Sequence, residues 1–216
     1  MGGVNATVAA GATDAFGRSP VIPVVTIDDP RRAVGLARAL VAGGLTAIEV
    51  TLRTPAALDC IRAVAGEVAD LIVGAGTVLD ARQADEARKA GARFLVSPGA
   101  TESLIEAVRG AGCPWLPGAG TVAEAMRLAE AGFTHLKFFP AEPSGGVAFL
   151  KAVAPVLPGI RFCPTGGVDA KNAPAYLALP NVFAVGGSWI APATALAAGD
   201  FAAIERLARE AAALRG

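Results

Sequence analysis

The chain has 216 residues, enough for one complete hydrophobic core, and its 19 basic and 19 acidic side chains balance to no net charge. Such a balance is not typical of proteins that bind nucleic acid or an anionic membrane surface. Hydrophobic residues make up 53% of the sequence, but no apolar run approaches the length of a membrane-spanning helix. We therefore expect a small-molecule ligand, with no nucleic-acid and no membrane partner.

The N-terminal segment, residues 1–18, lacks the positive charge and the continuous apolar stretch of a secretory signal. This pattern predicts a cytoplasmic protein in which residues 1–19 add a helical extension before the main domain. The three cysteines, Cys60, Cys113 and Cys163, are widely spaced and form no Cys-x-x-Cys pair. They predict buried free thiols, with neither a disulfide framework nor a zinc site.

Short apolar runs alternate with Ala-rich amphipathic segments along the rest of the chain, and this alternation is typical of successive β/α units. Eight runs predict strands, at residues 21–27, 47–52, 71–77, 94–97, 115–118, 135–139, 161–165 and 182–187. The segments between them start and stop with the residues that helices favour. We expect first-turn caps at Asp29, Asp80, Thr101, Thr121 and Asp169, and left-handed C-terminal glycines at Gly43, Gly91 and Gly132.

Eight strands, each followed by a helix, predict an α/β fold of the closed (β/α)8 TIM-barrel type. No long linker or shift in composition divides the sequence, so we expect residues 1–216 to form a single domain with the barrel at 20–210. A Rossmann-like open sheet is the structural alternative. Against it, no Gly-x-Gly-x-x-Gly follows the first strand, and the Gly-rich turns come after the seventh and eighth.

Polar residues inside the apolar runs share one face of their strands, because side chains alternate between the barrel interior and the helix layer. In the second strand this rule directs Glu49 and Arg53 inward, and in the sixth it directs Lys137 and Phe139 inward. Strands three and seven end at Thr77 and Thr165, at the end of a barrel where active sites form.

A buried lysine and a buried glutamate need an explanation, since both are almost never removed from water unless paired. An interior ion pair with a purely structural role is one explanation for Lys137 and Glu49. Schiff-base catalysis is the other, and we favour it. A desolvated amine can attack a carbonyl carbon while a neighbouring carboxylate moves protons. Arg53 then suits a substrate carboxylate, and Phe139 would exclude water from the amine.

Glycine-rich turns follow the last two predicted strands, at Thr165-Gly166-Gly167 and Gly186-Gly187-Ser188. Glycine lets the backbone approach an anion closely, and barrels often bind phosphate at these two loops. The placement predicts a phosphate site. The single histidine, His135, opens the sixth strand far from this mouth and is expected to be structural. With one histidine and no clustered carboxylates, we expect no catalytic metal.

Several motifs together resemble the 2-keto-3-deoxy-6-phosphogluconate (KDPG) and 4-hydroxy-2-oxoglutarate aldolase family, over residues 20–209. These motifs are Glu49-Val50-Thr51-Leu52-Arg53-Thr54, Val73-Gly74-Ala75-Gly76-Thr77, Lys137-Phe138-Phe139-Pro140-Ala141-Glu142, Arg161-Phe162-Cys163-Pro164-Thr165-Gly166-Gly167 and Gly186-Gly187-Ser188-Trp189. The resemblance implies a class I aldolase of the Entner-Doudoroff pathway that works without metal or other cofactor. It also implies 4-hydroxy-2-oxoglutarate aldolase activity and a homotrimer.

The resemblance also implies a role for each matching residue. Lys137 corresponds to the Schiff-base lysine and Glu49 to the general acid/base. The remaining matches imply carboxylate contacts at Arg53 and Thr77, a pocket lining at Pro98 and Phe139, and a phosphate end at Thr165, Gly166, Gly167, Gly186, Gly187 and Ser188. Gly120 departs from the family pattern, in which a serine precedes Thr121, and this change could loosen the loop.

Three other functions remain open at this stage. An isomerase or synthase barrel would share the phosphate loops without forming an imine. An aldolase for a galactonate-type substrate is expected to lack Thr51-Leu52-Arg53, which this chain has. A non-catalytic sugar-phosphate sensor would retain the pocket, but it would have no need to keep both Lys137 and Glu49.

Overall fold

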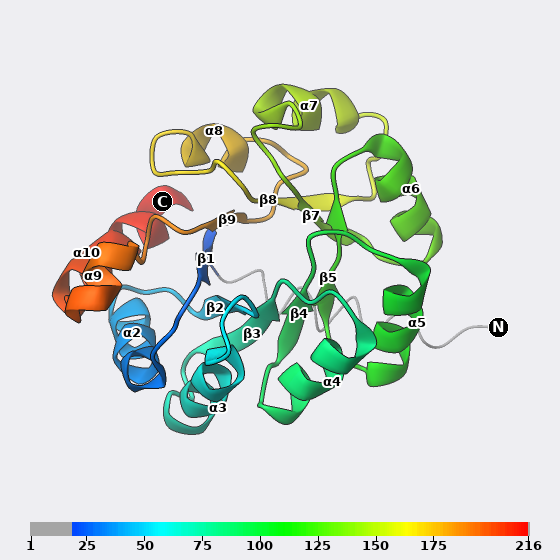
Figure 1. The fold of residues 1–216 in the computed structure, drawn as a ribbon. Helices are drawn as coiled ribbons and strands as arrows, with labels where there is room; N and C mark the ends of the chain where they lie inside the picture. Colours follow the sequence, from blue (N-terminus) through cyan, green and yellow to red (C-terminus); the bar gives the residue numbers. More distant parts are fainter. Residues whose placement is uncertain (1–18, 216) are drawn as a thin grey trace.

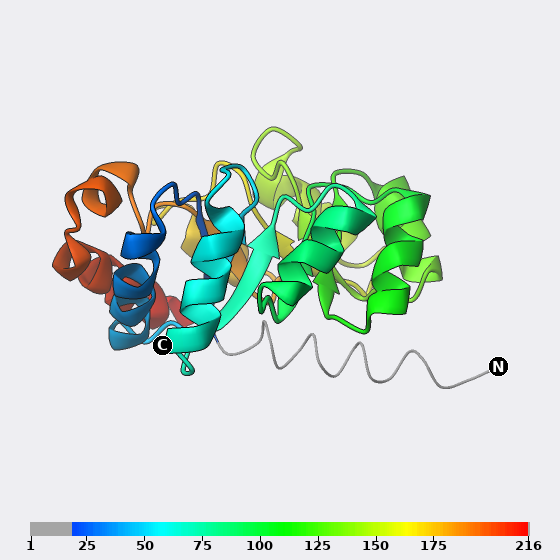
Figure 2. The ribbon, with the colours of Figure 1, turned by 60° about the horizontal axis from the view of Figure 1, so that its bottom comes forward.

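The computed structural model describes residues 19–215 of the chain. The predicted helical extension at residues 1–19 therefore lies, apart from Ser19, outside the described residues. In Figure 1 the strands occupy the centre and the helices lie outside them in chain order, and Figure 2 shows the helix layer from the side. The fold is α/β, with parallel strand pairing throughout the described sheets.

Strands and helices alternate along the chain. The strands are β1 (Val21–Val25), β2 (Ala47–Thr51), β3 (Ile72–Gly76), β4 (Phe94–Val96), β5 (Trp115–Leu116), β6 (Gly118–Ala119), β7 (His135–Phe138), β8 (Arg161–Pro164) and β9 (Val185–Gly187). The helices are α2 (Pro30–Ala42), α3 (Ala57–Glu67), α4 (Ala81–Lys89), α5 (Glu102–Ala111), α6 (Val122–Glu130), α7 (Gly146–Val153), α8 (Ala173–Leu177), α9 (Ala193–Ala198) and α10 (Phe201–Ala212), with a final 3-10 turn, η1 (Ala213–Arg215).

Two parallel sheets form the centre of the fold. One has six strands in the order β5-β4-β3-β2-β1-β9, and the other has three in the order β6-β7-β8. Two isolated bridges, between Phe162 and Val182 and between Thr165 and Gly186, connect the second sheet to the segment that contains β9. All eight predicted strand regions are therefore found in the described part of the chain, although the last is shorter than expected.

The fifth predicted strand is interrupted at Pro117, which separates β5 from β6. Proline has no backbone N–H, so it cannot continue the ladder of donors along a strand. Its carbonyl oxygen still accepts a hydrogen bond from the backbone N–H of Lys137, at 2.8 Å. One expected strand thus appears as two short ones that pair with different neighbours.

Alternation of side chains divides the apolar residues into two clusters. The larger cluster lies between the strands and the helices and includes Ile48, Val50, Leu136 and Phe138. The smaller cluster comes from the opposite faces of the strands and contains Ile22, Ala47, Phe94, Val96, Leu116, Cys163 and Ala184. This division confirms the predicted alternation in the second and sixth strands.

Most of the predicted helix signals are confirmed. The side chains of Asp29, Asp80, Thr101 and Thr121 each accept a hydrogen bond from a backbone N–H of the first turn of α2, α4, α5 and α6. Gly91 and Gly132 adopt positive φ angles of 100° and 93°.

Two predicted helix signals were wrong. Gly43 is right-handed with φ of −79°, and the next residue, Gly44, takes the left-handed conformation at 91°. Asp169 accepts from the N–H groups of Lys171 and Asn172 at 2.8 and 3.1 Å. It therefore closes a turn that precedes α8, and no side chain caps that helix.

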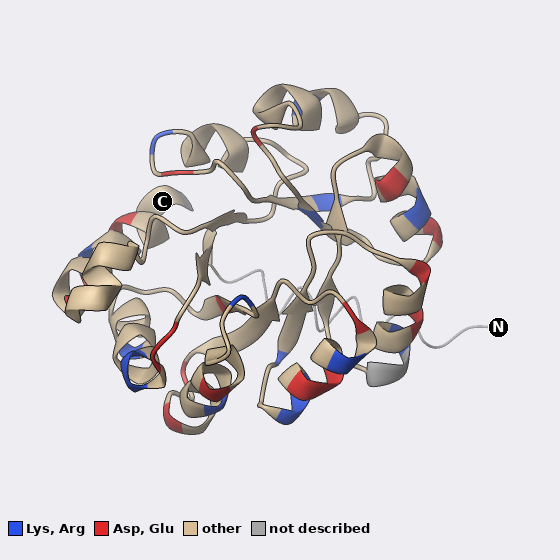
Figure 3. Cartoon of the chain, viewed as in Figure 1, with Lys and Arg blue, Asp and Glu red and all other residues tan. Residues whose placement is uncertain are grey.

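Charged side chains of both signs lie mainly along the outer helices, and few lie on the central strands (Figure 3). Among the described residues, no helix has both the length and the apolar character needed to cross a membrane.

Candidate active site

Lys137 and Glu49 face each other in the interior of the sheet assembly. The Lys137 Nζ atom lies 3.2 Å from Glu49 Oε1, and the two side chains are only 6% and 4% exposed. Lys137 is the third residue of β7 and Glu49 the third of β2, so the predicted inward orientation of both is confirmed. The predicted ion pair is present, and a proton can pass directly between the two groups at this distance.

Gly76 leaves the space that the Glu49 carboxylate occupies. A Cβ atom on Gly76 would lie 2.1 Å from Glu49 Oε1, far inside van der Waals contact. Gly76 pairs with Thr51 in the register of β2 and β3, two residues along from Glu49. The glycine at the end of β3 is therefore required for the carboxylate to point toward Lys137.

Cys163 lies beside Lys137 in the register of β7 and β8. Complete burial raises the pKa of the Cys163 thiol to about 12, an effect that the nearby Lys137 charge opposes. The thiol is therefore neutral at physiological pH and adds no charge beneath the ion pair. This arrangement confirms the prediction of buried free thiols, because Cys60 and Cys113 are also buried and unpaired.

The Phe139 ring lies above the lysine, with its centroid 5.4 Å from Lys137 Nζ. The ring also lies close to Gly166, where a Cβ atom would come within 3.3 Å of two ring carbons. An aromatic ring at this distance limits the access of water to the amine.

Arg53 and Thr77 meet at the carboxyl ends of β2 and β3. Arg53 Nε donates a hydrogen bond to Thr77 Oγ1 at 3.2 Å. Thr77 has φ of 58°, and it is the one non-glycine residue with positive φ among the described residues. Such a conformation is uncommon for threonine and is found often at functional sites. No ion pair to Arg53 is found between residues 19 and 215, so its guanidinium is available for a substrate anion.

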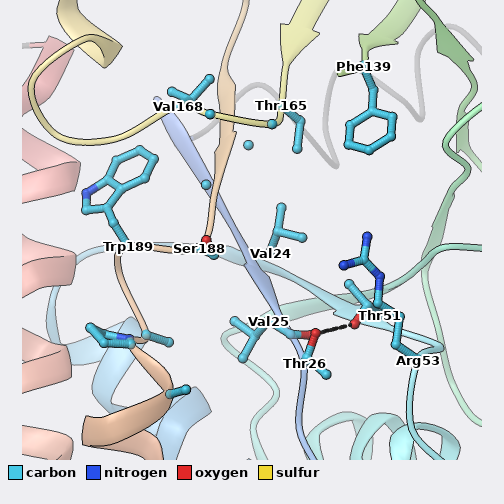
Figure 4. Close-up of a pocket in the computed structure, with 17 residues that line it drawn as sticks. Val24, Val25, Thr26, Thr51, Arg53, Phe139, Thr165, Val168, Ser188 and Trp189 are labelled. Atoms are coloured by element: carbon cyan, nitrogen blue, oxygen red, sulfur yellow. Dashed lines mark hydrogen bonds between the residues drawn. The ribbon is translucent and has the colours of Figure 1, made fainter. Parts of the chain in front are cut away.

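A cavity of about 530 Å³ opens beside this cluster. Figure 4 places the Arg53 guanidinium on the same side of the cavity as the Phe139 ring, with Val168 and Trp189 on the opposite side. Eight of the predicted site residues line it: Arg53, Phe139, Thr165, Gly166, Gly167, Gly186, Gly187 and Ser188.

The other four predicted residues do not belong to the cavity wall. Lys137 and Glu49 are buried behind Phe139 and Gly76. Thr77 contacts the cavity through Arg53. Pro98 packs with its carbonyl against Gly118, where a Cβ atom would lie 2.1 Å from the Pro98 oxygen, and Gly118 is the register partner of Lys137.

Two glycine-rich segments form one wall of the cavity: the glycine loop, residues 165–168, and the segment 186–188. Gly166 and Gly167 have φ of 99° and 80°, which L side chains rarely adopt. Gly186 lies against the Thr165 hydroxyl, and a Cβ there would be 2.2 Å from Thr165 Oγ1. The two segments are therefore in direct contact, as their bridge also indicates.

Backbone donors of these segments remain without protein partners. Within the described residues, no protein acceptor is found for the backbone N–H groups of Gly167 and Ser188. Both residues are exposed and line the cavity, so these donors can bind water or a ligand. Donors that line a cavity in a glycine-rich loop are suited to an anion such as phosphate.

Several residues of the cavity wall were not predicted. Thr26 Oγ1 lies 2.9 Å from Thr51 Oγ1 (Figure 4), and Thr51 also donates to the Val25 carbonyl at 3.3 Å. The alternation that identified Glu49 and Arg53 places Thr51 between them, so that signal was available. The remaining unpredicted residues are Val24, Val25, Val168, Trp189, Ala191, Pro192 and Ala193.

His135 has the structural environment that was predicted. Its Nδ1 atom lies 3.2 Å from Thr134 Oγ1, and its ring meets Phe183 edge-on at 5.1 Å. Burial, followed by the Arg161 charge, lowers the pKa of His135. The part of the chain that the structure describes contains no group of three His, Cys, Asp or Glu residues placed to hold a metal ion.

Gly120 forms ordered contacts despite its departure from the family pattern. Its backbone N–H donates to Glu124 Oε2 at 2.8 Å, and Thr121 and Glu124 form a reciprocal capping box at the start of α6. The side chain of Glu124 thus holds the loop that was expected to loosen.

Comparison with known proteins agrees with this geometry. Residues 13–207 match the model of the KDPG and KHG aldolases. The KHG/KDPG aldolase of Escherichia coli K12 is 51% identical over 192 residues, covering 89% of this chain and 90% of the relative.

Two solved structures superpose closely. The KDPG aldolase of Legionella pneumophila, with pyruvate captured as a covalent carbinolamine, has a TM-score of 0.90 and 43% identity, covering 92% of this chain and 97% of that one. The Zymomonas mobilis ZM4 aldolase with 3-phosphoglycerate has a TM-score of 0.90 and 45% identity, covering 94% and 95%. The chain belongs to the KDPG and KHG aldolase family.

Proposed function

We propose that this chain cleaves 2-keto-3-deoxy-6-phosphogluconate into pyruvate and D-glyceraldehyde 3-phosphate, as a class I aldolase of the Entner-Doudoroff pathway. The observation that carries this proposal is the 3.2 Å contact between Lys137 Nζ and Glu49 Oε1, buried beside a cavity lined by Arg53 and two glycine-rich segments. Family membership supports the same reaction, since relatives that span nearly the whole chain are carbon–carbon lyases.

In the first step, Glu49 takes a proton from Lys137 Nζ, 3.2 Å away, and the amine so formed attacks the C2 keto carbon of the substrate. Glu49 moves the protons that turn the carbinolamine oxygen into a leaving water, and a protonated imine remains. The Legionella structure holds pyruvate as a carbinolamine, the intermediate that precedes this loss of water.

In the second step, Glu49 takes the proton of the C4 hydroxyl and the bond between C3 and C4 breaks. The electron pair of the C3–C4 bond moves toward the positively charged imine and forms an enamine. C4 leaves as the aldehyde carbon of D-glyceraldehyde 3-phosphate. Glu49 then returns the proton to C3, and water hydrolyses the imine to pyruvate and free Lys137. Protons and electrons balance without a metal or a redox partner.

The substrate's two anionic ends suit the two ends of the cavity. Arg53, hydrogen bonded to Thr77, is suited to the carboxylate next to the keto carbon. The glycine loop and the segment 186–188 are suited to the phosphate, because they line the cavity and glycine lets an anion approach the backbone closely. Phe139, whose ring centroid lies 5.4 Å from Lys137 Nζ, would confine the reacting carbons near the lysine.

A second aldol substrate, 4-hydroxy-2-oxoglutarate, fits the same lysine chemistry, since it also carries a 2-keto acid and a 4-hydroxyl. The E. coli relative is a KHG/KDPG aldolase, which supports this side activity. Its distal carboxylate would replace the phosphate end.

The reaction can be tested by measuring pyruvate release from 2-keto-3-deoxy-6-phosphogluconate with a coupled assay. We expect Lys137→Ala to lose activity to background and Glu49→Gln to slow turnover by about 100- to 10,000-fold. Lys151→Ala, which removes an exposed lysine of α7, is the matched control and should turn over normally. Pyruvate release by Lys137→Ala at the wild-type rate would exclude the mechanism.

We also propose that residues 20–210 form one closed (β/α)8 barrel within a single domain. Support comes from the two bridges next to β9 and from the continuity of β5 and β6 on either side of Pro117. A homotrimer and a cytoplasmic location stay predictions, which sedimentation and cell fractionation would test.

A further inference from the structure

Two side chains behind the cavity wall connect the glycine loop to neighbouring elements. Tyr176, in α8, is fully buried, and its hydroxyl donates a hydrogen bond to Glu142 Oε1. Burial, followed by this hydrogen bond, raises the pKa of Tyr176, so the hydroxyl keeps its proton and remains a donor. Neither residue lines the cavity.

Glu142 contacts the glycine loop through its backbone and its side chain. Its backbone N–H donates to the Gly166 carbonyl at 3.0 Å. Its Cγ atom lies so close to Gly167 that a Cβ there would be 2.6 Å away. The Glu142 side chain therefore packs flat against the glycine, and a shift of that side chain would move the loop.

Other contacts fix the remaining sides of this arrangement. Asn172, just before α8, donates from Nδ2 to the Gly167 carbonyl at 2.9 Å. At the start of α7, a Cβ on Gly146 would lie 3.0 Å from the Tyr176 hydroxyl and 3.2 Å from Glu142 Oε1. The Tyr176–Glu142 hydrogen bond thus joins α7, α8 and the glycine loop at one point.

A loop with two adjacent glycines has little intrinsic conformational preference, so neighbouring groups must supply its order. We infer that Tyr176 and Glu142 are positioning residues for phosphate recognition, which hold the glycine loop so that its N–H groups face the cavity. This inference rests on the proposed function, because it assigns the ordered donors to the substrate phosphate.

The Tyr176→Phe variant tests the inference, because it removes the hydroxyl and keeps the ring that fills the core. Two rates are measured for each enzyme: cleavage of 2-keto-3-deoxy-6-phosphogluconate, and deuterium exchange of the pyruvate methyl group in D2O. Exchange requires the imine and Glu49 but no phosphate. We expect KM for the phosphorylated substrate to rise about fivefold, which corresponds to the net free energy of one lost hydrogen bond. The rate of deuterium exchange should stay unchanged.

An unchanged KM, or an equal loss of cleavage and exchange, would overturn the inference, since the second result indicates a general structural defect. A wild-type protein that releases no pyruvate from this substrate would instead refute the proposed function. The two failures are therefore distinguishable.

Substitutions of Glu142 give an independent test. Gln keeps an oxygen acceptor for the Tyr176 hydroxyl, so the KM of Glu142→Gln should stay close to the wild-type value. The KM of Glu142→Ala, which has no acceptor, should rise. Glu106→Ala removes an exposed glutamate of α5 and serves as the matched control with no effect. Equal KM increases in the Gln and Ala variants of Glu142 would contradict a role for the hydrogen bond.

Discussion

At the residue scale, the site depends on the absence of a side chain as much as on the presence of one. Glu49 can approach Lys137 because Gly76 leaves its side of β3 empty. A methyl group there would overlap the carboxylate, so Glu49 would have to move. The position of the general acid/base is therefore set by a residue that has no chemistry of its own.

Gly76→Ala is predicted to lower kcat by about 100-fold or more, because the displaced Glu49 can no longer transfer protons efficiently. Steady-state assays and circular dichroism together measure the loss and the retained fold. Gly66→Ala is the control: nothing lies within 4 Å of its Cβ position in α3, so kcat should not change and stability should rise by about 0.4–1 kcal/mol. Wild-type kcat in Gly76→Ala would show that the contact is unimportant.

Alternation along single strands was enough to predict that Lys137, Glu49, Arg53 and Phe139 share an interior. It could not show how far each lies from the cavity, because that depends on how neighbouring strands are offset. The pocket lining that the family resemblance implied for Pro98 is not found, since Pro98 packs on the Gly118 backbone and does not line the cavity. The Tyr176–Glu142 hydrogen bond could not be predicted from strand alternation either, because it joins residues 34 positions apart.

At the element scale, the predicted N-terminal helix caps are confirmed where the chain enters the helix directly from an extended residue. Asp29, Asp80, Thr101 and Thr121 all have extended backbone angles and cap their helices. Asp169 instead binds two N–H groups of an earlier turn, so α8 begins at Ala173 without a side-chain cap. Sequence alone does not distinguish a capping aspartate from one that closes a turn.

Asp80→Ala should destabilise the protein by about 1 kcal/mol, because Oδ1 no longer accepts the Gln83 N–H of α4, a bond of 2.7 Å. Urea unfolding measures the change. Asp70→Ala removes the same charge from an exposed residue between α3 and β3 and should have less effect. Equal destabilisation in the two variants would mean that charge, and not the cap, is responsible.

At the scale of the whole molecule, the sequence predicted the order and number of β/α units but not the break in the fifth strand. Pro117 lies inside a run that was predicted as one strand, yet it cannot donate to the ladder. Which strands pair across that break depends on long-range contacts that a single sequence does not encode locally.

Buried thiols make the stability of the whole fold sensitive to alkaline pH. Burial raises the pKa of Cys60 from 9.0 to about 11 and that of Cys163 from 9.0 to about 12. The folded state thus keeps protons that the unfolded state releases. Their contribution is fully present below pH 9.0 and is lost as pH rises toward the folded pKa values.

The urea midpoint, measured with a reductant, should therefore fall between about pH 8 and about pH 10.5. The fall should be smaller in Cys60→Ala, which lacks one of the three buried thiols whose pKa burial raises, regardless of its stability at neutral pH. A midpoint that stays constant across this range would contradict the argument.

The most direct test of the central claim is borohydride reduction in the presence of pyruvate, followed by digestion and mass spectrometry of all four lysines. We predict one pyruvate-derived adduct, on Lys137, and none on Lys89, Lys151 or Lys171, which are exposed. Glu49→Gln should still form some adduct, and Lys137→Ala should form none. An adduct on another lysine, or full aldolase activity with Lys137 unmodified, would contradict the account.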